Sequence, residues 1–147
     1  VKTQFHNITI DLKIDRDPLV SCFPAKLSQV FMNILVNACQ AIESRQRTDP
    51  LHEGKTVVSL FSEKDHIVIE FNDNGCGMNE LTQQKIFDPF VTTTRGEGGS
   101  GLGMHLVYNL VTQALNGNIE VESELGTGAT FYIEFPAVAV KMAGNHG

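Results

Sequence analysis

The sequence predicts an α+β fold, a two-layer sandwich in which helices cover one face of a mixed, mostly antiparallel sheet. Segments with helical spacing of apolar residues lie among pairs of segments in which apolar and polar residues alternate. The paired segments are too close in sequence to enclose the crossover helices of a parallel, doubly wound sheet. With 147 residues, 41% of them hydrophobic, the chain suits one compact domain, which we expect at 1–136, followed by a tail at 137–147.

The N-terminal part of the chain predicts strands and one long helix. Ile8, Ile10 and Leu12 alternate with polar residues, which indicates a strand at 5–12, and a short second strand is expected at 19–23. The helix should begin at Pro24, because proline is tolerated in a first helical turn, and end near Arg47.

Beyond this helix the same two periodicities predict two hairpins and two further helices. In chain order these are strands at 56–62 and 66–71, a short helix at 81–86, a helix from Leu102 to Ala114, and strands at 119–123 and 131–135. Turns are expected at Lys64-Asp65 and Gly126–Gly128, and Asn116-Gly117 should stop the last helix.

Composition excludes several classes of protein. The net charge is −6 and the eleven Lys and Arg are scattered, so the basic patch of a nucleic-acid-binding protein is missing. No apolar run approaches the roughly 20 residues of a membrane span. The three cysteines are Cys22, Cys39 and Cys76, and their spacing is not that of metal ligands. We therefore expect them to be buried free thiols and not to have a redox or metal-binding role. We expect a cytoplasmic domain, whether or not the full-length protein has a membrane anchor.

A polar stripe runs along the long helix beside its apolar stripe. Asn33, Asn37, Gln40 and Ser44 are spaced by four, three and four residues, so they share one side of the helix. Such a stripe can face a bound ligand or simply solvent, and the segment alone leaves both interpretations open.

A carboxylate ends the strand expected at 66–71. Ile67, Ile69 and Phe71 take one face of that strand, and the same parity places Asp73 on the apolar side, where an unpaired carboxylate is costly. It is suited to accept a hydrogen bond from an exocyclic amine such as that of adenine, with Gly75 and Gly77 allowing close approach. The alternative is an Asn-Gly turn in which Asp73 is a cap.

Glycines concentrate between residues 96 and 103, immediately before the last helix. Backbone N–H groups and the positive end of a helix dipole suit an anion such as a polyphosphate. No Lys-Ser or Lys-Thr follows, which excludes a Walker loop, and no strand feeds the loop, which excludes a dinucleotide fingerprint. A flexible linker is the alternative.

In this order the three features resemble the ATP site of the family that includes histidine kinases, gyrase, the mismatch-repair MutL proteins and a heat-shock chaperone. The matching segments are the N box at 29–38, the first glycine box at 73–77, the F box at 87–90, the second glycine box at 99–103 and the last at 126–131. The F box and Thr92–Thr94 favour sensor histidine kinases within this GHKL superfamily, and Asn37–Ala41 resembles sensors of the nitrogen-regulation type.

This resemblance implies the Bergerat ATP-binding fold and a site for ATP with Mg²⁺. Asn37 would bind the metal, Asp73 would accept from the adenine amine, and Arg95 would replace a lysine that many histidine kinases carry. Asn33 takes the position where gyrase-like relatives have a water-activating glutamate. The other residues implied to bind the nucleotide are Gly75, Gly77, Met78, Phe90, Thr92, Thr93, Gly99, Ser100, Gly101, Leu102, Gly103 and Thr130.

The expected function is that of the catalytic domain of a histidine kinase. No His-Glu pair opens a long helix, so we expect the phosphoacceptor histidine on a separate dimerisation domain of the same full-length protein, through which the protein would dimerise. A response regulator would receive the phosphate. The rival interpretations are an ATP-driven switch resembling gyrase or the chaperone, and a module that binds ATP without catalysis.

Overall fold

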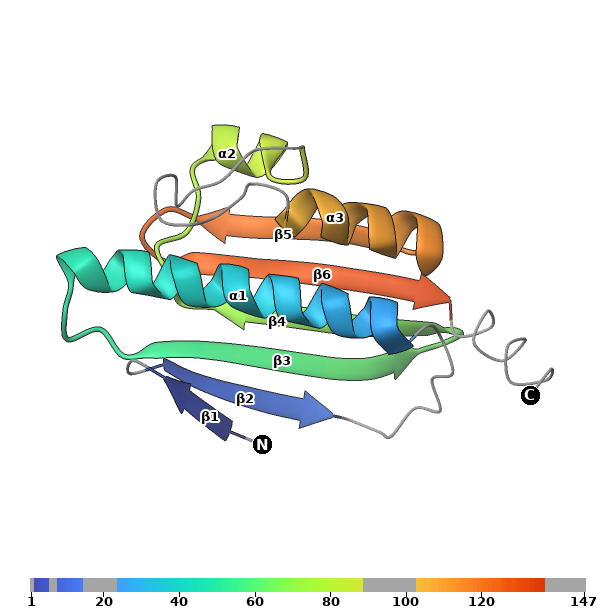
Figure 1. Ribbon diagram of the computed structural model, residues 1–147, viewed down its shortest axis with the longest axis horizontal. Helices are drawn as coiled ribbons and strands as arrows, with labels where there is room; N and C mark the ends of the chain where they lie inside the picture. Colours follow the sequence, from blue (N-terminus) through green and yellow to red (C-terminus); the bar gives the residue numbers. More distant parts are fainter. Residues whose placement is uncertain (1, 6–7, 15–23, 89–102, 137–147) are drawn as a thin grey trace.

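The computed structural model of the chain describes residues 2–5, 8–14, 24–88 and 103–136, which form two layers (Figure 1). Helices lie on one face of a sheet, as the α+β prediction required. The elements are β1 (Lys2–Phe5), β2 (Ile8–Ile14), α1 (Pro24–Thr48), β3 (Gly54–Glu63), β4 (His66–Asp73), α2 (Glu80–Lys85), α3 (Gly103–Asn109), η1 (Leu110–Ala114), β5 (Asn118–Glu124) and β6 (Gly128–Pro136).

Among the described residues the sheet has six strands, in the order β1-β2-β3-β4-β6-β5. Only β2 and β3 pair in parallel, and α1 is the crossover between them, as a parallel connection requires. The other neighbouring strands pair antiparallel through short connections. The prediction of a mixed, mostly antiparallel sheet is therefore confirmed.

The single strand expected at 5–12 was wrong. The chain forms two strands there, and they pair antiparallel with Phe5 opposite Ile8 and Lys2 opposite Asp11. The alternation changes phase at this break, because Phe5 is apolar at an odd-numbered position whereas Ile8 begins a run that is apolar at even-numbered ones. The short strand expected at 19–23 and the tail at 137–147 lie outside the described residues.

The last helix changes its winding along its length. It begins as an α-helix at Gly103 and continues from Leu110 to Ala114 as a π-helix. Asn116 then takes a left-handed backbone conformation with φ 56°, and the Gly117 N–H donates to the Val111 carbonyl at 2.8 Å. The expected stop at Asn116-Gly117 is confirmed.

The core lies between the helices and the inner face of the sheet. Phe31 on α1 packs edge-on against Phe71 on β4, with ring centroids 5.1 Å apart. Each buried aliphatic or aromatic side chain contributes roughly 1.5–3 kcal/mol through removal from water. The almost completely buried core residues include Val30, Ile34, Val58, Ile69, Phe71, Val107, Val111, Phe131, Ile133 and Phe135.

The structure bears on two expectations from the sequence, the absence of a membrane span and the free state of the cysteines. Within the described ranges no helix is long and apolar enough to cross a membrane. Cys39 and Cys76 are free and half-buried, and Cys22 lies outside the described residues. Burial, with smaller contributions from Glu43 and Asp73, raises the pKa of the Cys39 thiol, which keeps it protonated and unreactive.

Candidate functional site

Asp73 ends β4 on the inner face of the sheet, as parity predicted. Ile67, Ile69 and Phe71 precede it on the same face, and its side chain is only 3% exposed. One carboxylate oxygen accepts a hydrogen bond from the Gly75 N–H at 2.9 Å. Asp73 is thus a buried carboxylate that also caps the following turn, and its acceptance of an exocyclic amine stays a prediction.

Burial dominates the electrostatics of this carboxyl group. It raises the pKa of Asp73 from 3.8 to about 6, and hydrogen bonds with the backbone of Gly75 and Ala129 offset the shift only in part. An additional hydrogen-bond donor would therefore be favourable, because it would stabilise the charged form in a poorly solvated place.

Gly75 and Gly77 press the loop after β4 against its neighbours. A Cβ at Gly75 would lie 2.7 Å from the carbonyl carbon of Ala41, and the Cys76 N–H donates to the Ala41 oxygen at 3.0 Å. Gly77 has φ 71°, and a Cβ there would overlap the carbonyl oxygen of Glu124. Only glycine fits either position, and the loop is consequently held directly against α1.

Arg45, near the end of α1, binds this loop with hydrogen bonds that sequence reasoning missed. Its Nη1 donates to the carbonyl oxygens of Asn74 at 3.0 Å, Gly75 at 3.4 Å and Thr127 at 3.4 Å. A basic residue near a helix C-terminus is a common pattern, and it does not reveal which distant carbonyls the side chain will meet. Arg45 links the first glycine box to the β5–β6 turn.

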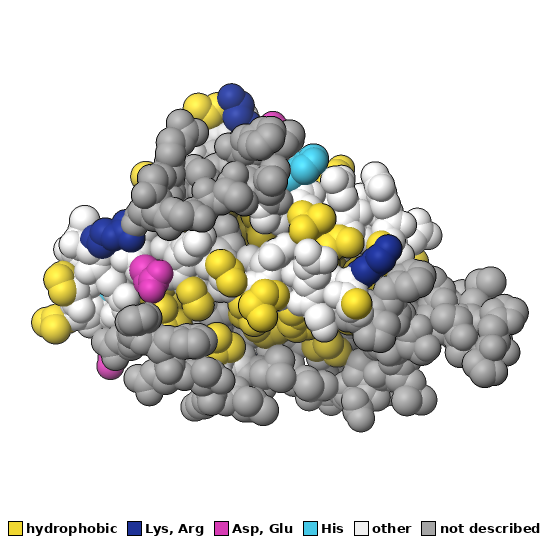
Figure 2. Space-filling model, in the orientation of Figure 1, with side chains coloured by type: hydrophobic (Ala, Val, Ile, Leu, Met, Phe, Trp, Pro, Cys, Tyr) yellow, Lys and Arg dark blue, Asp and Glu magenta, His cyan; other side chains and the backbone are white. Residues whose placement is uncertain are grey.

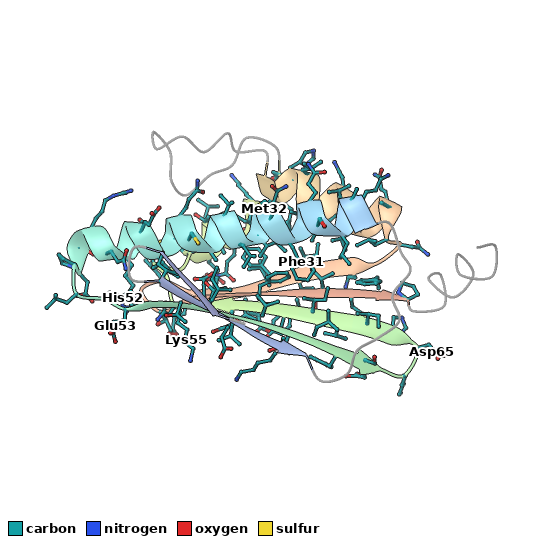
Figure 3. All side chains as sticks on the ribbon, turned by 60° about the horizontal axis from the view of Figure 1, so that its bottom comes forward. Phe31, Met32, His52, Glu53, Lys55 and Asp65 are labelled. Carbon is teal, nitrogen blue, oxygen red and sulfur yellow. The ribbon has the colours of Figure 1, made fainter. Side chains whose placement is uncertain are left out.

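Asn74 is held from the other side by the start of β3. Its Oδ1 accepts from the Lys55 N–H at 2.7 Å and its Nδ2 donates to the Glu53 carbonyl at 3.0 Å. The His52 Nε2 lies 2.8 Å from the Asn74 carbonyl and must carry the proton, because a carbonyl oxygen only accepts. Figure 3 shows His52, Glu53 and Lys55 together at this end of the molecule.

The polar stripe of α1 lies at the margin between buried and exposed sides of the helix. Figure 3 shows Phe31 directed toward the sheet and Met32 away from it. Met32 is 62% exposed and Val36 is 45% exposed, and hydrophobic side chains reach the surface over α1 in Figure 2. Asn33 and Asn37 are half-buried, as are Gln40 and Ser44, so the stripe is not a fully solvated face.

Thr130, expected near the nucleotide, lies on β6 beside the residue that pairs with Asp73. On β6 it pairs with Asn72, whose Nδ2 donates to the Thr130 hydroxyl at 2.7 Å on the helix-free face of the sheet. The residue opposite Asp73 is Ala129, which is buried. Alternation counted back from Phe131 would have placed residue 129, and not residue 130, on the inner face.

The other predicted residues divide into two groups. The described group consists of Asn37 on α1, Asp73 at the end of β4, and Gly75, Gly77 and Met78 in the loop that follows β4. Met78 is buried, and its N–H donates to Ser123 Oγ at 2.8 Å. Gly103 begins α3. The second group lies outside the described residues and consists of Phe90, Thr92, Thr93, Arg95, Gly99, Ser100, Gly101 and Leu102.

Two further features bear on ligands. A hollow of about 510 Å³ includes Asp73, Asn72 and Thr130 in its lining, but α1 contributes nothing to it, so it lies apart from the polar stripe. In the described ranges no three His, Cys, Asp or Glu side chains cluster closely enough to hold a metal ion. Mg²⁺ often needs only one or two protein oxygens beside phosphate, and the half-buried Asn37 amide fits that requirement.

Comparison with known proteins agrees with this geometry. Residues 23–139 match the family model described as histidine kinase-, DNA gyrase B- and HSP90-like ATPase. Sporulation kinase E of Bacillus subtilis is 36% identical over 124 residues, covering 84% of this chain and 15% of the relative. The signal transduction histidine-protein kinase AtoS of Escherichia coli is 41% identical over 111 residues, covering 75% of this chain and 16% of the relative.

Solved structures give the same result. The nucleotide-free catalytic domain of histidine kinase ThkA superposes with a TM-score of 0.74 at 25% identity, covering 90% of this chain and 80% of that one. Full-length ShkA in complex with AMPPNP superposes with a TM-score of 0.71 at 27% identity, covering 89% of this chain and 26% of ShkA. The chain spans less than a fifth of the length of the two curated relatives described above.

Proposed function

This chain belongs to the family of histidine kinase-, DNA gyrase B- and HSP90-like ATPases, and from that premise we propose that it is the ATP-binding catalytic domain of a sensor histidine kinase. The domain would present the γ-phosphate of ATP to a histidine on a separate dimerisation domain of the same protein. Its work would take place in the cytoplasm, where ATP is available, and a response regulator would then receive the phosphate.

The observation that carries this proposal is the buried carboxylate of Asp73 beside a loop that only glycine permits. Asp73 is 3% exposed and accepts hydrogen bonds from the backbone of Gly75, at 2.9 Å, and of Ala129. An ionised carboxylate has room for about four donors, so it can accept another. A nucleic base with an exocyclic amine offers such a donor and an apolar ring that suits the surrounding core. We assign Asp73 to the adenine amine, with Gly75, Gly77 and Met78 shaping the pocket.

The phosphate end of the site is assigned through α1 and the second glycine box. Mg²⁺, when bound, would neutralise phosphate charge and fix the geometry of the triphosphate. Asn37 would hold this ion through its amide oxygen. Gly99 to Gly103 would offer backbone N–H groups to the phosphates, and Arg95 a positive charge; this part of the proposal rests on the sequence.

Asn33 distinguishes a kinase from an ATP-driven switch. It lies one helical turn before Asn37 and is half-buried on the same side of α1. An amide cannot remove a proton from water, and base catalysis typically contributes about 10²–10⁴-fold to a rate. A kinase domain whose nucleophile is a histidine on another domain needs no base that activates water. The lack of such a base protects its bound ATP from hydrolysis.

The experiment is to measure phosphate release and phosphohistidine formation by the purified chain with Mg²⁺ and ATP. Alone, the chain should bind ATP and release phosphate very slowly. Addition of a dimerisation domain bearing the acceptor histidine should produce phosphohistidine, and the same domain with His→Gln should not. Brisk hydrolysis by the chain alone, near 1 s⁻¹ or faster, would overturn the proposal in favour of the switch.

A further inference from the structure

Thr56, on β3, carries a buried hydroxyl group that the core does not use. The residue is 1% exposed, and in the part of the chain that the structure describes its Oγ1 is the buried side-chain polar atom that lacks a hydrogen-bond partner. An unpaired buried hydroxyl is destabilising compared with a methyl group of the same size. A function in ligand binding would explain why threonine and not valine occupies this position.

Strand register places this hydroxyl beside Asp73. The Asn74 N–H donates to the Lys55 carbonyl at 3.2 Å, and the Lys55 N–H donates to Asn74 Oδ1 at 2.7 Å, so hydrogen bonds join the residues just outside the end of the β3–β4 ladder. Thr56 and Asp73 are the next pair along, which is therefore the non-hydrogen-bonded kind in which side chains lie closest, with Cβ atoms about 4.5–5.5 Å apart. Both side chains are buried on the inner face of the sheet.

The other strand neighbour of Asp73 offers no equivalent group. Ala129 lies opposite Asp73 on β6 and hydrogen-bonds the carboxylate through its backbone, but its side chain is only a methyl group. The Thr130 hydroxyl is bound by Asn72 on the far face. Asp73 is paired with Thr56 on one side and Ala129 on the other, and of these two residues Thr56 is the one with a side-chain hydroxyl. Rotation about its Cα–Cβ bond would direct this hydroxyl toward the carboxylate.

We propose that Thr56 is a positioning residue for base recognition: its hydroxyl donates to the Asp73 carboxylate when the exocyclic amine of a 6-aminopurine nucleotide binds there. This inference rests on the proposed function of the site. An ionised carboxylate has room for about four donors, so the backbone of Gly75 and Ala129, the Thr56 hydroxyl and the base amine can all bind it. Together they hold the carboxylate in the orientation that the amine requires.

Thr56→Val and Thr56→Ser separate this role from a merely structural one. Valine keeps the shape and removes the unpartnered hydroxyl, so the variant should unfold at the same denaturant concentration as the parent or a higher one. Its affinity for Mg-ATP, measured by calorimetric titration, should nevertheless fall about tenfold, the effect of one hydrogen bond to a charged group. Thr56→Ser keeps the hydroxyl and should bind Mg-ATP within about twofold of the parent.

Purine riboside triphosphate, which lacks the 6-amino group, is the matched ligand. The parent should bind it more weakly than ATP, and Thr56→Val should bind it as the parent does. If the parent binds ATP but Thr56→Val binds ATP equally well, or weakens both nucleotides alike, the role of Thr56 is overturned. If the parent binds neither nucleotide, the proposed function itself fails.

Discussion

Gly75 lies so close to Ala41 that a methyl group in place of its hydrogen would stand 2.7 Å from the Ala41 Cβ. The contact joins the loop after β4 to the middle of α1, and the hydrogen bond from Cys76 to the Ala41 carbonyl reinforces it. Because Asn37 lies one helical turn before Ala41, this approach determines how the polar stripe of α1 is placed relative to Asp73.

Gly75→Ala should therefore destabilise the fold and weaken ATP binding together. Van der Waals overlap with the backbone of α1 must be relieved by moving the loop, which typically costs about 1–3 kcal/mol. Urea unfolding and calorimetric titration measure the two effects. Gly103→Ala is the control for stability, because a Cβ there meets no atom of the described residues within 4 Å. Parental stability in Gly75→Ala would show that the loop is not held against α1.

Asp73→Asn should weaken ATP binding at least tenfold. The amide presents a donor where the adenine amine already donates, which leaves a buried mismatch of roughly 1–3 kcal/mol. Asn72→Ala is the matched control, since Asn72 is the neighbouring residue on the opposite face of β4 and binds Thr130. If Asp73→Asn bound ATP as the parent does, Asp73 would be only the cap of its turn.

The raised pKa of Asp73 predicts how stability should vary with pH. Since that pKa rises from 3.8 to about 6 on folding, the folded chain retains a proton that the unfolded chain has lost between these values. The contribution of Asp73 to the free energy of unfolding should thus fall as pH rises from about 4 to about 6, by up to roughly 3 kcal/mol, and stay constant above. Asp73→Asn should lack this component. Parallel stability curves for parent and variant between pH 4 and 7 would contradict the assignment.

Arg45→Met should loosen the first glycine box without a large change in α1 itself. It removes the donor to the carbonyls of Asn74, Gly75 and Thr127, and we expect a loss of about 1–2 kcal/mol in stability. Because the acceptors are neutral carbonyls, the loss should persist at high salt, unlike that of a surface ion pair. Arg45→Lys should recover only part of it, since one ammonium replaces a planar fork of donors. Full stability of Arg45→Met in thermal unfolding would rule out this role.

Local periodicity was a reliable guide where a segment keeps one environment along its length. The long helix was expected from Pro24 to near Arg47 and extends from Pro24 to Thr48. Asp73 was placed on the inner face by counting from Ile67, and it is buried there. The boundary between Phe5 and Ile8 was missed, although the parity of the apolar positions changes there and two paired strands meet at it.

What the sequence by itself determined is the class of fold, the family and the identity of the buried carboxylate, because these depend on spacing within one segment or on the order of motifs. What only the tertiary structure decided is which distant groups meet. Arg45 reaches Thr127, 82 residues away, and the register of β3 against β4 sets Thr56 opposite Asp73. Register and helix docking result from packing between segments, so no pattern inside a single segment specifies them.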